Sequence, residues 1–413
     1  EELINFENHK IIINYTKDKT DIKGNGKILI KDKFDSINYE VIKNNDKFIF
    51  NTKTIIKSSK LLIDFLEYEK KENVTASIVM NGNFKKNNPI NFDLISLKEK
   101  DNIILFKNIN FSKDFKLISL NSFNINYLNN NKIKNKLILI KKNSNYSIIG
   151  ESFDATRLIN EIMDSDDEDS FLFSNFNSKI SLEINKTYID NVNFINNLSG
   201  VLSFKNNKIN DLKLKSIFPN NKKISLSVKT NDKQEKITKL STGYPKPLIK
   251  RYDFIKGFED GFLVYQSVKK DRISNSLLTI NNFKVIEVPA FAKLLSLASL
   301  QGIADLLTGE GIRFNDFEMQ FSNKKGLTTI DEMYAIGPAV SILMEGYIES
   351  KKTISLRGTL VPATTINRSI ASIPLLGGIL VGKKTGEGVF GVSFKIKGHP
   401  KDLKTTVNPI KTL

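Results

Sequence analysis

Apolar and polar residues alternate over short segments along most of the chain. The segment 353–360 places Ile354, Leu356 and Leu360 on one face and polar residues on the other, and segment 389–397 alternates in the same way. Successive side chains of a β-strand point to opposite faces, so a period of two indicates a strand with one buried face. The pattern therefore predicts strands rather than helices for these segments.

The first 240 residues repeat this alternation at close intervals. Typical strand segments are 27–30, 47–50, 136–140 and 224–228, and the turn signals between such segments are Asn44-Asn45, Asn87-Asn88, Asn129–Asn131, Asn206-Asn207 and Asn220-Asn221. Asn tolerates positive φ and hydrogen-bonds to its own backbone, so these clusters predict hairpin turns. Many short strands without intervening helical patterns predict a mainly β, antiparallel structure.

Three segments break the strand pattern. Asp154 is a candidate cap for a short helix over 154–163, which an acidic run at 164–169 follows. A second helix is expected from Pro289 to Leu307, where apolar residues recur at helical spacing. A third short helix is expected near 366–373, before an apolar loop that contains three glycines.

Composition changes near residue 240. Seventeen of the 22 glycines and eight of the ten prolines follow this position. Proline restricts its own φ and disfavours helix in the preceding residue, so Tyr244–Pro247 is a candidate boundary. We predict a repetitive β-strand region over 1–240 and a second β region, with two helical or apolar insertions, over 241–413.

The second region carries a combination of short motifs in a fixed order. They are Phe283–Pro289, Gly309–Phe314, Gly326–Asp331, Leu356–Ala363, Ile373–Gly377, Gly386–Gly388 and Val407–Pro409. In this order, the motifs resemble the C-terminal region of the AsmA-like bacterial envelope proteins, the family of YhdP and TamB type. The resemblance covers roughly residues 255–413, and the first 240 residues match in style alone.

The resemblance implies a fold and a role. The implied fold is a long, twisted antiparallel sheet curled into an open groove, with a few short helices near the C-terminal end. The implied role is non-enzymatic, bridge-type transport of phospholipid between the inner and outer membranes of a Gram-negative cell. The protein would lie in the periplasm and be anchored to the inner membrane in its full-length form. The alternative is a scaffolding β-domain that assists outer-membrane protein assembly.

The residues alone leave two arrangements open for the apolar faces of the strands. Few helices are available to cover these faces, so the strands either close on themselves as a sandwich or leave an apolar trough. In a trough, acyl chains would replace core side chains. Candidate lipid- or membrane-contact residues lie in the helix at 289–307 and in the apolar loop at 375–382. They are Phe291, Leu294, Leu297, Leu300, Leu375, Leu376, Ile379, Leu380 and Val381.

The net charge of +17 makes polyanions candidate partners, but the ratio of Arg to Lys is unusually low. Six of the 62 basic residues are Arg, whereas nucleic-acid surfaces favour Arg for its bidentate hydrogen bonds and stacking. Three explanations of the positive charge are open: compositional drift toward Lys and Asn, affinity for anionic lipid headgroups, and nucleic-acid binding. We expect no nucleic acid among the partners.

Catalytic and metal-binding motifs are absent from the sequence. It has no Cys, and its two histidines, His9 and His399, are near opposite ends. The stretch 377–384 resembles a phosphate-binding loop, but Lys384 occupies the position that needs Ser or Thr. The run at 164–169 lacks the spacing of a calcium loop, and the carboxylates Asp154, Glu161 and Asp164 have no evident substrate pocket. We therefore expect no enzyme activity, no cofactor and no metal site.

The chain shows no secretory signal and no apolar run long enough to span a bilayer. It begins with Glu1 rather than Met. We expect it to be a mature form or an excised piece of a longer protein, from which the family's membrane anchor is missing.

Overall fold

The structure is a computed structural model that describes most of the chain. The described residues are 4–86, 88–159, 177–206, 208–249, 256–287, 311–349, 352–362, 392–400 and 402–409. The chain divides into two compact units, Glu1–Pro219 (unit 1) and Asn220–Leu413 (unit 2).

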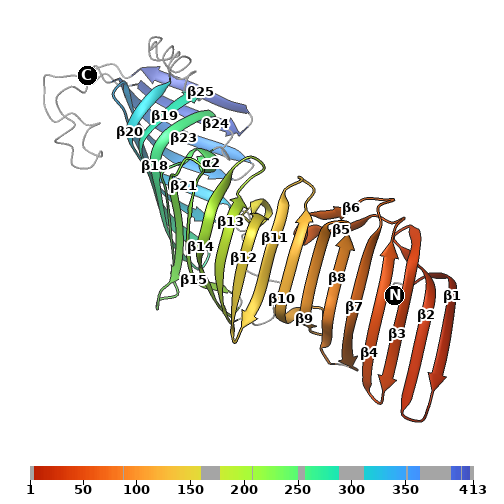
Figure 1. Cartoon of the computed structure of the whole chain (residues 1–413). Helices are drawn as coiled ribbons and strands as arrows, with labels where there is room; N and C mark the ends of the chain where they lie inside the picture. Colours follow the sequence, from red (N-terminus) through yellow and green to blue (C-terminus); the bar gives the residue numbers. More distant parts are fainter. Residues whose placement is uncertain are drawn as a thin grey trace, which may run out of the picture. The chain divides into compact units, whose positions relative to one another are not determined.

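The protein is mainly β, and 23 of its strands belong to one sheet (Figure 1). Within the described residues β1 pairs with β2 alone and β25 with β24 alone, so the sheet is open. The predicted fold class, a mainly β protein with an open sheet and few helices, is confirmed.

Where the structure describes unit 1, thirteen strands of this sheet are present. They are β1 (Phe6–Tyr15), β2 (Lys19–Ile30), β3 (Lys33–Asn44), β4 (Lys47–Ile56), β7 (Ala76–Lys85), β8 (Ile90–Glu99), β9 (Asn102–Phe111), β10 (Leu117–Leu128), β11 (Lys134–Lys142), β12 (Asn145–Asp154), β13 (Lys179–Tyr188), β14 (Phe194–Lys205) and β15 (Lys208–Ile217). Each strand pairs with the next one in this order, and every pair except β12 with β13 is antiparallel.

The strand ends of unit 1 form two rims. One rim carries the connections 31–32, 57–75, 100–101, 129–133 and 189–193, together with residues 155–159 after β12. We call it the hairpin rim, because β5 (Leu61–Ile63), the 3-10 turn η1 (Asp64–Leu66) and β6 (Tyr68–Lys70) form a small hairpin there (Figure 1). The other rim, which we call the turn rim, carries the connections 16–18, 45–46, 86–89, 112–116, 143–144 and 206–207, and the start of β13.

The described residues of unit 2 form ten strands and one short helix. They are β16 (Lys223–Thr230), β17 (Lys236–Thr242), α2 (Lys246–Ile249), β18 (Lys256–Lys270), β19 (Ile273–Glu287), β20 (Ile312–Lys324), β21 (Leu327–Ile336), β22 (Val340–Glu349), β23 (Thr353–Pro362), β24 (Val392–His399) and β25 (Asp402–Pro409). Every consecutive pair from β16 to β25 is antiparallel.

Asparagine residues adopt the left-handed backbone conformation in several turns. Asn45, Asn143, Asn206 and Asn221 all have positive φ, between 49° and 61°, and each lies between two strands. Asn adopts this conformation at lower cost than most residues. The turn signals at 44–45, 206 and 221 therefore mark real changes of chain direction, as predicted.

One neighbouring pair departs from the predicted antiparallel order. Strands β12 and β13 pair in parallel over eight matched positions, from Tyr146 with Ile180 to Asp154 with Tyr188. Parallel neighbours need a crossover of a dozen or more residues, and residues 155–178 connect these two strands. The sequence pattern predicts a helix and a loop here, and it gives no sign that β13 runs in the same direction as β12.

The predicted helix at 154–163 is described in part. Residues 156–159 are helical, and the Oδ1 atom of Asp154 accepts a hydrogen bond from the Thr156 amide at 3.0 Å. The rest of that helix and the acidic run lie outside the described residues, as do the helices expected at 289–307 and 366–373. The composition change near 240 falls within β17, which pairs with both β16 and β18. The boundary at residue 240 stays a prediction.

Glycines permit close strand approach at particular points of the sheet. A Cβ on Gly200 would overlap with the carbonyl oxygen of Lys213 on β15, and one on Gly82 with that of Asn91 on β8. The strand register shifts between Asn81 and Gly82. Glycine inside a strand typically marks such a bulge or close backbone approach.

We predict that Gly200→Ala destabilises unit 1 by about 1–3 kcal/mol, because the new methyl group forces β14 and β15 apart. Gly243→Ala is the control, since its Cβ would lie 3.5 Å from the nearest atom, Cδ of Lys222. It should change the free energy of unfolding by less than about 0.5 kcal/mol. Urea denaturation followed by circular dichroism measures both, and equal effects would contradict the close-approach explanation.

Candidate functional site

One face of unit 1 is covered with apolar side chains that align from strand to strand. The longest row pairs, in order, Thr52, Met80, Ile95, Phe106, Phe123, Leu139, Ile148, Leu182, Gly200 and Leu214. A parallel row pairs Ile78, Leu97, Ile104, Ile125, Leu137, Gly150, Ile184 and Leu198. Paired residues of neighbouring strands lie on the same face. We call this surface the apolar face of unit 1.

Unit 2 has an apolar face built in the same way. One row pairs Leu240, Tyr265, Leu278, Met319, Met333, Met344, Gly358, Phe394 and Val407. Beside it, the rings of Phe258, Phe283 and Phe314 stack with centroid distances of 5.2 and 5.4 Å. The strand predicted for segment 353–360 is present as β23, and Ile354 and Leu360 are buried, but Thr359 from the predicted polar face is buried too.

Apolar side chains of unit 1 gather in two clusters. The cluster beside the hairpin rim contains Leu97, Ile104, Ile125 and Leu137, and residues from outside the large sheet, Leu61, Ile63, Leu66 and Tyr68, pack on it. The cluster beside the turn rim is centred on Ile109, Leu120, Leu139 and Tyr146, and all of its described members belong to strands of the large sheet. The β5–β6 hairpin therefore covers one side of the apolar face.

The base of the hairpin is held by two buried charged residues. Asp35 accepts hydrogen bonds from the backbone amides of Lys57, Ser58 and Ser59 at 2.8, 2.8 and 2.9 Å. Burial raises the pKa of Asp35, but these hydrogen bonds outweigh it and hold the pKa below its usual range. The Lys70 ammonium donates to the carbonyl oxygens of Lys57 and Ser59, and burial lowers its pKa.

The tip of the hairpin is tied to the neighbouring turn. Tyr127 donates its hydroxyl to the Leu66 carbonyl at 2.8 Å, and the Asn130 amide donates to the Glu67 carbonyl at 3.0 Å. Tyr68 is fully buried and donates to the Glu99 carboxylate. Burial, reinforced by that bond, raises the pKa of Tyr68, so the phenol stays protonated. These contacts fix the hairpin on the sheet.

Asp154, one of the carboxylates considered from the sequence, belongs to a structural network. Its Oδ2 atom accepts from the Asn129 side chain at 2.7 Å, and its amide donates to Asn135 Oδ1 at 2.8 Å. All three side chains are buried. The network joins the ends of β10, β11 and β12. The hydrogen bonds of Asp154 therefore stabilise the fold. Its two proposed partners, Glu161 and Asp164, lie outside the described residues.

The two rims of unit 1 differ in charge when each connection is taken with the strand residue on either side. The described basic residues of the turn rim are Lys17, Lys19, Lys47, Lys85, Lys86, Lys113, Lys116, Lys142, Lys179, Lys205 and Lys208, and its acidic residues are Asp18, Asp46 and Asp114. Those of the hairpin rim are Lys31, Lys33, Lys57, Lys60, Lys70, Lys71, Lys100, Lys132, Lys134 and Arg157, with Asp32, Asp64, Glu67, Glu69, Glu72, Glu99, Asp101, Asp154 and Asp190. In the described part of unit 1, the hairpin rim thus mixes both signs, whereas the turn rim is strongly basic.

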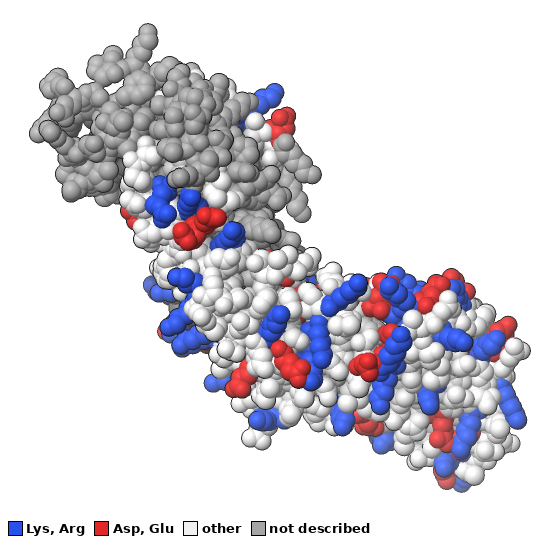
Figure 2. Space-filling view, turned by 45° about the horizontal axis from the view of Figure 1, so that its top comes forward, with Lys and Arg blue, Asp and Glu red and all other residues white. Residues whose placement is uncertain are grey.

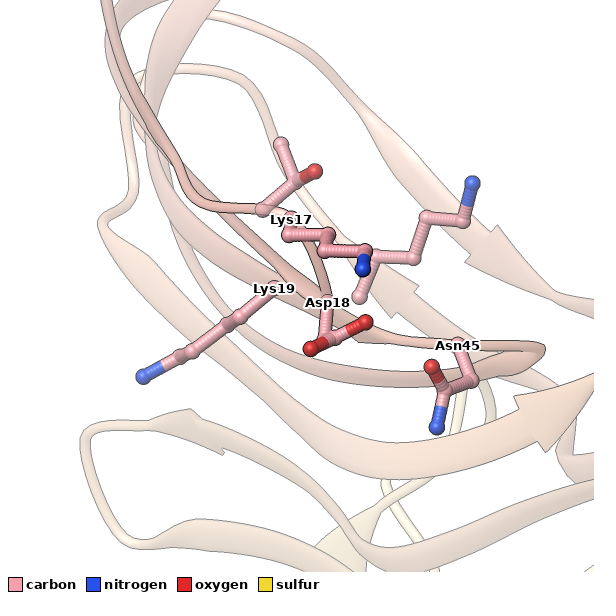
Figure 3. A pocket seen from close by; sticks show the side chains of 6 residues that line it. Lys17, Asp18, Lys19 and Asn45 are labelled. Atoms are coloured by element: carbon pink, nitrogen blue, oxygen red, sulfur yellow. The ribbon is translucent and has the colours of Figure 1, made fainter.

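A polar hollow lies at one end of the turn rim. It is lined by Lys17, Asp18, Lys19, Thr20, Lys43 and Asn45, which belong to the turns after β1 and β3 and to the adjoining ends of β2 and β3 (Figure 3). The Asn45 amide donates to the Asp18 carbonyl at 3.3 Å. The lining is polar and open, which does not suit an apolar ligand.

The nine lipid- or membrane-contact candidates from the sequence all lie outside the described residues, and so does the glycine-rich stretch 377–384. The two histidines are described. His9 stacks on Tyr39 and lies 3.1 Å from its hydroxyl, and His399 ends β24. In the described part of the chain no group of three His, Cys, Asp or Glu is placed to hold a metal ion. No helix among the described residues is long and apolar enough to cross a membrane.

Sequence reasoning missed the β5–β6 hairpin and the charge difference between the rims. Leu61-Leu62-Ile63 and Tyr68 carry the apolar signal of the hairpin, but their partners lie on strands far along the chain. Comparison of the chain with protein-family models, with curated proteins and with solved structures finds no match.

We predict that Asp35→Asn loosens the hairpin, because the new amide group faces the Ser59 N–H, which then loses its acceptor. The expected loss is about 1–3 kcal/mol of stability, with faster hydrogen exchange at residues 57–75. Asp46→Asn, at an exposed turn, is the control and should leave this exchange unchanged.

The same variant has a pH signature. The stabilisation from the lowered pKa of Asp35 is complete above the ordinary carboxyl pKa of 3.8 and is lost as pH falls through the lowered value. The stability difference between the native chain and Asp35→Asn should therefore be constant from about pH 5 to 7 and shrink below about pH 4. A difference that grows on acidification would contradict this assignment.

Proposed function

We propose that the chain is a segment of a non-enzymatic, bridge-type lipid carrier, in which the apolar faces of the sheet hold acyl chains. The observation that carries the proposal is the alignment of mainly apolar residues, with a few glycines, over successive strands of an open sheet. A sheet face of this kind needs an apolar partner. Acyl chains supply one, with about 0.8 kcal/mol gained for each methylene buried.

The methionine row of unit 2 supports a ligand of variable shape. Met319, Met333 and Met344 are half-buried and are paired across three successive strands. Methionine is flexible and polarisable, and it is frequent at surfaces that accommodate different apolar ligands. Phospholipid acyl chains differ in length and unsaturation, and this row suits them better than a rigid row of β-branched residues would.

The resemblance to AsmA-like proteins extends the proposal to the cellular setting. In that setting the chain acts in the periplasm, within a longer protein anchored to the inner membrane, and passes phospholipid toward the outer membrane. The alternative is a scaffold for outer-membrane protein assembly, whose apolar faces would be covered by protein rather than lipid.

Native mass spectrometry of the purified chain, followed by extraction and lipid identification, tests the proposal. Several co-purifying phospholipids per chain are the expected result. A mass that corresponds to the protein alone, with no uptake from labelled liposomes, would overturn the proposal and favour the scaffold.

We predict that single charges on the apolar face reduce lipid uptake, whereas the same charge on the opposite face does not. Adjacent residues provide matched pairs, because they point to opposite faces. Met80→Glu and Met344→Glu should lower the lipid bound per chain at least about five-fold, since a carboxylate is costly beside acyl chains.

The controls are Val79→Glu and Leu343→Glu, which introduce the same charge one residue away. All four native residues are half-buried. Circular dichroism confirms folding of each variant before lipid is measured. Equal loss in both members of a pair would show that the effect comes from the fold rather than from the apolar face.

A further inference from the structure

Among the described residues, the turn rim of unit 1 owes its positive charge to a shortage of acidic side chains. Both rims carry a similar number of basic residues, but the described acidic residues lie mostly on the hairpin rim. A general drift of composition toward Lys would enrich both rims and would not remove Asp and Glu from one of them. The asymmetry therefore calls for an explanation specific to the turn rim.

Charges on the hairpin rim are balanced locally. Lys33 pairs with Glu72 at 2.6 Å, and Lys60 pairs with Glu69 at 3.0 Å. Figure 2, which brings this rim forward, shows Lys and Arg interspersed with Asp and Glu. On the turn rim, Lys85 lies 3.6 Å from Asp46, and both side chains are more than half exposed. The fields of neighbouring lysines add along such a rim and attract anions.

Apolar groups accompany the lysines of the turn rim. Phe115 is 70% exposed between Lys113 and Lys116, and Tyr15 is 81% exposed beside Lys17. On the apolar face next to this rim lies the cluster centred on Ile109, Leu120, Leu139 and Tyr146. An apolar surface that meets a lysine-rich edge matches an amphiphile with an anionic end.

The β5–β6 hairpin decides which way such an amphiphile lies. Its side chains Leu61, Ile63, Leu66 and Tyr68 occupy the cluster beside the hairpin rim. A polar headgroup that left over that rim would have to pass the hairpin, whose base and tip are both fixed by hydrogen bonds. The headgroup therefore leaves over the turn rim.

We propose that unit 1 selects anionic phospholipids, whose acyl chains lie on the apolar face and whose phosphate groups lie along the lysines of the turn rim. This inference rests on the proposed function, because it requires lipid on the apolar face. It adds the headgroup class and the orientation. Anionic headgroups such as phosphatidylglycerol keep their net negative charge, whereas the ammonium of phosphatidylcholine cancels it, so the rim distinguishes them electrostatically.

The test is lipid uptake from vesicles that contain equal amounts of phosphatidylglycerol and phosphatidylcholine. After incubation the protein is separated from the vesicles, so that surface adsorption does not count, and bound lipid is quantified by mass spectrometry. The rim variant is Lys85→Gln, Lys86→Gln, Lys113→Gln and Lys116→Gln combined. The matched control on the hairpin rim is Lys31→Gln, Lys100→Gln, Lys132→Gln and Lys134→Gln combined. All eight lysines are exposed, so both variants should fold.

We expect the native chain to bind phosphatidylglycerol at least about five-fold over phosphatidylcholine. The rim variant should lose this preference and keep most of its total uptake, while the control variant keeps the preference. Inorganic phosphate at concentrations equal to the lipid phosphate should not displace bound lipid, which distinguishes a lipid site from a site for free phosphate.

Three outcomes would overturn the inference. Equal uptake of both lipids would leave the carrier function standing and remove the headgroup selectivity. Equal loss of preference in both variants would show that net charge, not the turn rim, matters. Absence of any uptake would overturn the carrier function and this inference together.

Discussion

The alignment of side chains across strands is the constraint on which the rest of the structure depends. A slip of one residue between two strands would move every apolar side chain of one of them to the other face. The row from Thr52 to Leu214 survives ten strands without such a slip. Turns fixed by Asn, and glycines such as Gly200 that let backbones approach, keep the strands in this register. The apolar faces form because these turns and glycines are all compatible with the same strand register.

The β5–β6 hairpin is the point where the repetitive pattern is replaced by specific polar contacts. A buried carboxylate and a buried ammonium are costly unless their hydrogen-bonding groups are satisfied. Asp35 meets three backbone amides, and Lys70 meets two backbone carbonyls. Such contacts hold only in one geometry, so they place Leu66 and Tyr68 over the apolar face at a fixed position. The hairpin covers the apolar face on one side, so the two sides of that face differ in cover as well as in charge.

Much of the fold follows from local sequence, and most of the candidate site does not. Alternation in segments such as 353–360, and Asn at turns such as 45 and 221, suffice for the strands, the turns and the mainly β class. Strand register, the parallel pair of β12 and β13, and the row of Met319, Met333 and Met344 depend on pairing between distant segments. A linear pattern does not encode which strand lies next to which. The apolar residues chosen from the sequence, from Phe291 to Val381, stood out because they broke the strand pattern, whereas the apolar faces are built from the pattern itself.

The electrostatic difference between the rims has the same origin as the fold. In an up-and-down sheet, alternate turns fall on opposite rims, so residues such as Lys85 and Lys113 are brought to one side although a whole strand pair separates them in sequence. Composition alone shows a basic protein with few Arg residues, and leaves drift, lipid and nucleic acid as explanations. Topology separates the described charges of the unit 1 turns into a mixed rim and a basic rim, each bordering the same apolar face. A surface that is apolar in the middle, covered by a hairpin on one side and basic on the other, has the polarity of a phospholipid with an anionic headgroup.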